Sequence, residues 1–158
     1  MPPKRFRYRL EKVLEMKLRK EEEEKEKLGK LRQELEHERQ VKAQLEQQLE
    51  NVHLELKTKR LSGMLNINEL RWFPQHIKNL EGKIKYQELR IQELLIKIEE
   101  QTQALAKAMQ ERKAYEKHKE QSHQAWVAEV DAEEARLIDE LATIKFARML
   151  ATQAEEQA

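Results

Sequence analysis

The sequence predicts an all-α fold, a two-helix antiparallel coiled-coil hairpin in which a longer second helix overhangs the first. Three observations support this prediction. The 158 residues include only three glycines and three prolines, and 39% of them are charged while 5% are aromatic, which leaves little material for a compact apolar core. Two long stretches repeat apolar residues every 3.5 positions, the period of a left-handed coiled coil. A single cluster of turn-forming residues, from Arg60 to Asn68, separates the two stretches.

The first helix is predicted over residues 1–60, with a basic start. Fourteen seam positions run from Leu10 to Leu56 in alternating steps of four and three residues, and nine of them are Leu or Val. Three successive seam positions are charged instead, namely Lys17, Glu21 and Glu24. Because a coiled-coil seam favours apolar side chains, we expect the two helices to separate most easily there.

The turn is predicted over residues 61–68. Gly63 favours a chain reversal, and Asn66 or Asn68 can cap the helix that follows. Because the two apolar frames are nearly equal in length and the turn is short, antiparallel pairing is favoured. We expect Leu56 to lie opposite Phe73.

The second helix is predicted over residues 69–150, followed by a frayed tail over 151–158. Pro74 is tolerable near a helix start, where its missing N–H is not needed. Eleven of the fourteen seam positions from Leu70 to Tyr115 are apolar. From about residue 120 the second helix overhangs the first, with a new apolar stripe. Since one helix cannot bury its own apolar face, we expect a partner there, either a second copy or another protein. The stripe comprises Trp126, Val130, Leu137, Leu141 and Ile144.

Motifs that carry chemistry are mostly missing. The 31 basic and 30 acidic residues nearly cancel, which argues against nucleic acid as a partner. There is no cysteine, and the three glycines cannot form a phosphate-binding loop. Three Glu-x-x-His pairs have the spacing of di-iron ligands, but surface histidines explain them better among so many glutamates. We therefore expect no catalytic residue, no metal and no cofactor. The pairs are Glu34/His37, Glu50/His53 and Glu120/His123.

Charge and apolar side chains are nevertheless concentrated in places. Residues 1–20 hold eight basic and two acidic side chains, whereas residues 128–142 hold six acidic side chains and one arginine. The basic start favours a protein contact or a frayed arm over nucleic-acid binding. Trp72 and Tyr86 fall outside the seam, where they form either a docking patch or part of the packing of the turn. Asp139 and Glu140 either meet a basic groove of a partner or form a solvated helix face.

Three stretches resemble the family of the flagellar export protein FliJ. The start, Phe6-Arg7-Tyr8-Arg9-Leu10 followed by Val13-Leu14, resembles the opening of that family. The segment Leu70-Arg71-Trp72, with Ile77, Leu80-Glu81 and Ile84, resembles the beginning of its second helix, although Pro74 departs from the pattern. The end resembles its carboxy-terminal signature, Glu133-Glu134-Ala135-Arg136-Leu137-Ile138-Asp139-Glu140-Leu141-Ala142 and Phe146-Ala147-Arg148.

This resemblance implies a soluble, cytoplasmic and non-enzymatic component of the flagellar type III export apparatus, peripherally associated with the membrane-embedded export gate. Members of the family are similar to the central stalk of rotary ATPases. They associate with the hexameric export ATPase FliI, with the gate protein FlhA and with export chaperones. On this basis, we hypothesise an ATPase side formed by Arg5, Arg7, Arg9, Arg136, Asp139, Glu140 and Arg148. The gate side would be formed by Trp72, Tyr86 and Leu89.

Two alternatives share the fold. One is the stalk protein of a virulence-type type III secretion system, which would serve different cargo. The other is a generic coiled-coil scaffold that self-associates through the stretch after Trp126 and has no ATPase partner.

Overall fold

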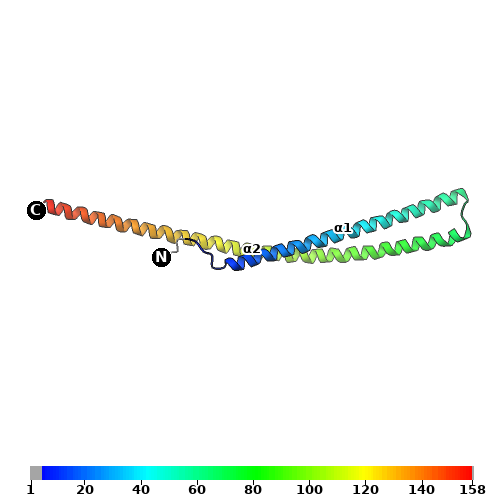
Figure 1. Ribbon diagram of the computed structural model, residues 1–158, viewed down its shortest axis with the longest axis horizontal. Coiled ribbons are helices and arrows are strands. Elements are labelled where there is room, and N and C mark those ends of the chain that lie inside the picture. The colour runs from blue at the N-terminus through cyan, green and yellow to red at the C-terminus, as the bar shows by residue number, and fades with distance from the viewer. Residues whose placement is uncertain (1–4, 158) are drawn as a thin grey trace. The chain divides into compact units, whose positions relative to one another are not determined.

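The computed structural model describes residues 5–157, and all of the regular structure in this range is helical. Helix α1 spans Glu11–Ser62 and helix α2 spans Ile67–Glu156, joined by a short turn (Figure 1). Residues 20–62 and 67–109 pack in antiparallel directions, so the predicted all-α helical hairpin is confirmed. Helix α2 continues to Glu156, into the segment expected to fray, because residues 151–156 contain no glycine or proline to stop it.

The chain divides into two compact units, which we describe separately. The hairpin unit consists of residues 20–109 and contains the turn. The terminal unit consists of the described residues 5–19 and 110–157.

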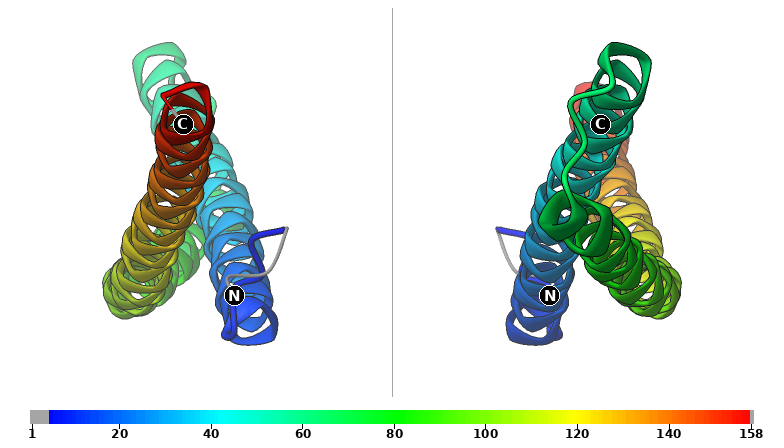
Figure 2. Two further views of the ribbon diagram at one scale, coloured as in Figure 1. Left: turned by 90° about the vertical axis from the view of Figure 1, so that its left-hand side faces the viewer. Right: turned by 90° about the vertical axis from the view of Figure 1, so that its right-hand side faces the viewer.

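The turn of the hairpin unit is encoded by residues at the two helix ends (Figure 2). Gly63 has a φ of 70°, the left-handed conformation that glycine adopts without steric cost. The amides of Gly63 and Met64 donate to the carbonyls of Arg60 and Lys59, at 3.4 and 3.2 Å, which is a Schellman motif closing α1. At the start of α2, the amide of Glu69 donates to Asn66 Oδ1 at 2.8 Å, so Asn66 is the N-cap.

Apolar side chains close to the turn form the most buried part of the seam. Val52, Phe73 and Leu80 make up the core cluster, and Phe73 is the most deeply buried of them. Further seam residues pack around this cluster. They are Leu45, Leu49, Leu56, Leu65 and Ile77.

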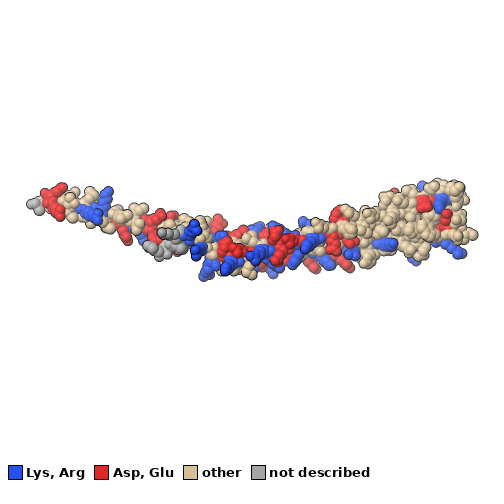
Figure 3. Space-filling view, viewed as in Figure 1, with Lys and Arg blue, Asp and Glu red and all other residues tan. Residues whose placement is uncertain are grey.

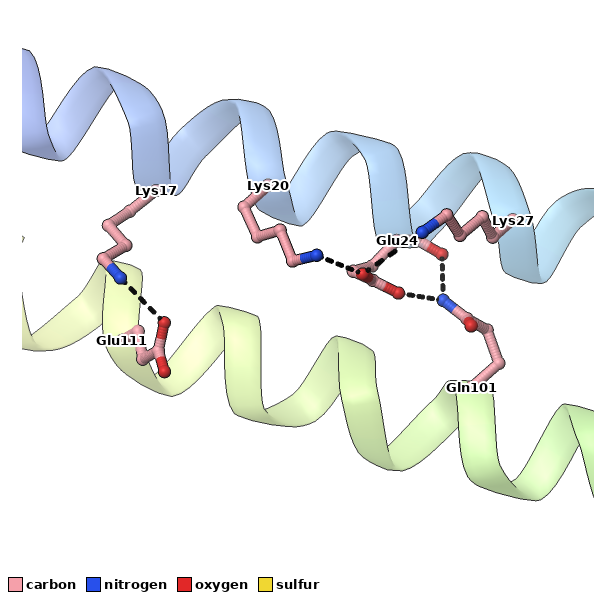
Figure 4. A network of polar contacts seen from close by, with 6 residues as sticks. All are labelled: Lys17, Lys20, Glu24, Lys27, Gln101 and Glu111. Carbon is pink, nitrogen blue, oxygen red and sulfur yellow. Dashed lines mark hydrogen bonds and ion pairs between the residues drawn. The ribbon is translucent and has the colours of Figure 1, made fainter.

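Two polar layers interrupt the apolar seam of the hairpin unit. Gln87 donates through Nε2 to the backbone carbonyl of Glu38 at 3.0 Å and also to its carboxylate. Gln101 repeats this arrangement on Glu24, whose carbonyl accepts at 3.1 Å (Figure 4). Glu24 is 5% and Glu38 8% exposed, so each buried carboxylate depends on an amide from the opposite helix.

The register of the two helices at these layers differs from the expected one. Glu38 lies level with Gln87, and heptad steps from this pair place Phe73 level with Val52 rather than with Leu56. The expected register would have placed Glu38 opposite Ile91, which has no side-chain donor. The register with a donor is therefore favoured, because an unsatisfied buried carboxylate is costly.

The charged seam positions that we expected to weaken the pairing are held by partners. Lys20 Nζ lies 2.9 Å from Glu24 Oε1 and lowers the pKa of Glu24, with Gln101 adding to the effect. In the terminal unit, Lys17 Nζ lies 3.0 Å from Glu111 Oε2 (Figure 4). Lys17 and Glu24 are thus ion-paired, and easier separation of the helices at these positions stays a prediction.

Candidate partner-binding surfaces

The ten residues hypothesised to bind partners fall into both units. Trp72, Tyr86 and Leu89 belong to the hairpin unit. The seven others belong to the terminal unit, three of them before α1 and four on α2. These seven are Arg5, Arg7, Arg9, Arg136, Asp139, Glu140 and Arg148.

The hairpin-unit set forms an exposed apolar face on α2. Trp72, Tyr86 and Leu89 are 52%, 65% and 61% exposed. Trp72 and Tyr86 are two heptads apart, and Leu89 follows three residues later, so all three project from one side of the helix. Trp72 also stacks on His76 with a centroid distance of 4.7 Å, which fixes its ring while leaving half of it accessible.

A shallow depression accompanies this face. It has a volume of about 290 Å³ and is lined by Tyr86, Leu89 and Leu94, with Glu34 and Lys97 among its charged residues. On the face shown in Figure 3, charged side chains are sparse over the part of the hairpin unit next to the turn. A surface that combines exposed aromatic and aliphatic side chains with charged groups suits a protein partner.

An ion pair joins the two ends of the turn. Lys59 Nζ lies 2.8 Å from Glu69 Oε1 and 5.5 Å from the centre of the Phe73 ring. The hydrogen bond from Lys59 lowers the pKa of Glu69, and the same bond raises the pKa of Lys59. The pair therefore holds the start of α2 against the last turn of α1.

The four α2 residues of the terminal-unit set lie on what we call the uncovered stretch, residues 127–156. Every described side chain from Glu134 onward is exposed, including the apolar Leu137, Leu141 and Ile144. Arg136 and Glu140 are four residues apart and share one side of the helix with Asp139. The stretch combines charged and apolar groups that no other described part of the terminal unit covers.

The residues before α1 contact helix α2, which was not predicted from the sequence. We call residues 5–10 the strap. The hydroxyl of Tyr8 donates to the carbonyl of Tyr115 at 3.3 Å and lies 2.7 Å from His118 Nδ1. The ring of Phe6 meets His123 edge-on at 5.0 Å and lies 6.0 Å from Trp126. The strap thus reaches along α2 as far as Trp126, and His118 and His123 contact its aromatic rings while remaining exposed.

Across residues 5–157, no group of three or more His, Asp or Glu side chains is arranged to hold a metal ion. His123, from one of the three Glu-x-x-His pairs, contacts Phe6 and Trp126 instead. No helix within this range is long and apolar enough to cross a membrane.

Comparison with known proteins gives one family. The family model described as the flagellar FliJ protein matches residues 6–151, nearly the whole chain. No curated protein and no solved structure matches the chain significantly. The matched range includes both hypothesised surfaces apart from Arg5.

Proposed function

Because this chain belongs to the flagellar FliJ protein family, we propose that it is a coiled-coil stalk that binds the hexameric export ATPase and couples it to the export gate and to export chaperones. The family is non-enzymatic and acts in flagellar type III protein export. The family match favours this role over that of a virulence-type stalk. The observation that carries the proposal is the uncovered stretch of α2, a long helix with exposed apolar and charged groups.

The ATPase side lies on the terminal unit. A single helix with an uncovered apolar stripe gains free energy by burying that stripe against a partner. Leu137, Leu141 and Ile144 provide the stripe, and Asp139 and Glu140 provide carboxylates beside it. A ring-shaped ATPase with a narrow central opening suits a helix of this kind.

The gate side lies on the hairpin unit. Trp72 is a rigid aromatic side chain of the type that dominates binding energy at protein interfaces. Tyr86 and Leu89 border the depression described above. This arrangement supports a protein partner, for which we propose the gate protein FlhA. The protein would then work in the cytoplasm, at the periphery of the inner-membrane export apparatus.

The ATPase side is tested by charge reversal. We expect Asp139→Lys with Glu140→Lys to weaken binding to the purified export ATPase about tenfold, because rim charges of an interface become repulsive. The measurement is isothermal titration calorimetry together with stimulation of ATP hydrolysis. A matched control reverses Glu99 and Glu100, an exposed pair on the hairpin-unit part of α2. Unchanged affinity and unchanged stimulation in the Asp139/Glu140 variant would contradict the assignment.

The gate side is tested separately. We expect Trp72→Ala with Leu89→Ala to weaken binding to the cytoplasmic domain of the gate protein while leaving ATPase binding intact. Leu54→Ala, at an exposed leucine of α1, serves as the control. Sedimentation of the unmodified chain covers the scaffold alternative: a tight homodimer that binds no ATPase would replace the stalk proposal.

A further inference from the structure

The exposure of the strap alternates residue by residue. Arg5, Arg7 and Arg9 are exposed, whereas Phe6 is partly buried and Tyr8 is buried. Such alternation turns every second side chain to the same side, as in an extended strand. One side of the strap is therefore aromatic and packed against α2, and the other carries three guanidinium groups.

The aromatic side is fixed at two points on α2. Tyr8 is held through its hydroxyl, which donates to the Tyr115 carbonyl and lies 2.7 Å from His118 Nδ1. Phe6 is held by its edge-on contact with His123. The carbonyl of Tyr8 also accepts the amide of Glu11 at 3.2 Å, which connects the strap to the first turn of α1. The arginines therefore project from an anchored backbone.

The charges of the three arginines are not neutralised within the described residues 5–157, where no ion pair or hydrogen bond joins their guanidinium groups to another side chain. Three other basic groups of the terminal unit, by contrast, have carboxylate partners. Lys119 lies 2.8 Å from Glu11, Arg112 lies 2.8 Å from Glu116, and Lys17 lies 3.0 Å from Glu111. The three guanidinium groups of the strap are thus available to a partner.

We propose that the strap presents Arg5, Arg7 and Arg9 as a fixed row of guanidinium groups that binds a carboxylate-lined face of a partner protein. Each planar guanidinium can donate two parallel hydrogen bonds to one carboxylate. Anchoring by Phe6 and Tyr8 lowers the ordering cost of binding. The inference depends on the proposed function only in taking the export ATPase as the partner.

A protein carboxylate suits this row better than nucleic acid or a lipid surface does. Phe6 and Tyr8 would stack on bases or enter a bilayer, but both are already packed against α2. Three charges also form a short row compared with the phosphate contacts of typical nucleic-acid-binding proteins.

The test uses the full chain and a fluorescein-labelled peptide of about ten glutamates, with fluorescence anisotropy at about 50 mM salt to limit screening. Replacing the three strap arginines by glutamine should weaken binding about tenfold, as expected for the loss of three surface ion pairs. The control replaces three exposed basic residues of the hairpin unit by glutamine and should keep the wild-type affinity. These are Lys30, Arg32 and Lys83.

The anchor is tested by Phe6→Ala with Tyr8→Ala, which keeps all three arginines. We expect this variant to bind the peptide about threefold more weakly, because the row must then be ordered on binding. Circular dichroism should show unchanged helix content, since the strap lies outside both helices. Wild-type affinity in the anchor variant, or an equal loss in the control, would overturn the inference.

Two further measurements separate this inference from the proposed function. Tighter binding of a single-stranded oligonucleotide or of anionic vesicles than of the glutamate peptide would overturn the carboxylate assignment. Binding to the export ATPase is then measured with the same variants. If the wild-type chain does not bind the ATPase, the proposed function fails, whereas the peptide results still decide the inference.

Discussion

Removing the amide of Gln87 tests whether the buried carboxylate of Glu38 depends on it. In Gln87→Leu the carboxylate loses its hydrogen bond from Gln87 and keeps only Arg90, whose Nε lies 3.2 Å from Oε1. A hydrogen bond to a charged group contributes about 1.5–3 kcal/mol, and the added leucine returns roughly 1 kcal/mol by burial. We therefore expect the free energy of unfolding to fall by about 0.5–2 kcal/mol.

The double variant Glu38→Leu with Gln87→Leu should reverse this loss. It replaces the polar layer by two leucines of the kind found elsewhere in the seam, and Arg90 is exposed enough to return to water. Replacing a buried polar pair by apolar side chains is often neutral or stabilising. We expect a stability equal to or above that of the wild type.

The assay is urea unfolding followed by circular dichroism at 222 nm, with Gln92→Leu as the control at an exposed position of α2. The control should remain within about 0.5 kcal/mol of the wild type. If Gln87→Leu proves as stable as the double variant, the carboxylate does not need its amide partner, and the explanation given for the register is wrong.

Three other predictions concern the turn and its surroundings. Gly63→Ala should destabilise the chain by about 1 kcal/mol because of the positive φ. Gly82→Ala should instead stabilise it by about 0.5–1 kcal/mol, because Gly82 lies inside α2 with open space around it. Urea unfolding of both variants checks that the two changes in stability have opposite signs. The pKa of Glu69 is lowered, so its contribution to stability should be present above pH 4.5 and lost as pH falls through the lowered value. The pKa of Lys59 is raised, so its contribution should be present below pH 10.5 and lost as pH rises through the raised value. Glu69→Gln should flatten both limbs of the stability–pH curve, and curves identical to the wild type would contradict this assignment. Pro74→Ala should raise the thermal midpoint by a few degrees, because Pro74 lies inside α2 and cannot donate a helix hydrogen bond; an unchanged midpoint in calorimetry would show that the helix already accommodates it.

The helices and the turn could be predicted because short-range signals encode them. The left-handed glycine at position 63 and the cap at Asn66 act within a few residues of the chain reversal. The register could not be predicted in the same way. A seam that repeats every 3.5 residues looks similar after a shift of four residues, and only the donors for Glu24 and Glu38 distinguish the alternatives.

The contact of the strap was missed for a different reason. Phe6 and Tyr8 precede the heptad frame, and their partners His118 and His123 lie more than a hundred positions away in the chain. The one signal in the sequence was the alternation of arginine with aromatic residues from position 5 to position 9. Alternation of this kind indicates a two-sided segment, but it does not identify the surface against which one side packs.

The two glutamate–glutamine layers have a mechanical consequence for the hairpin unit. Sliding α1 past α2 by half a heptad or a whole heptad, in either direction, would bring isoleucine, leucine or alanine level with both carboxylates. Each such step would remove the amide that donates to each of the two buried carboxylates, so the helices resist translation relative to each other. A force applied near Gly63 would therefore twist or bend the paired helices, because α1 resists sliding along α2.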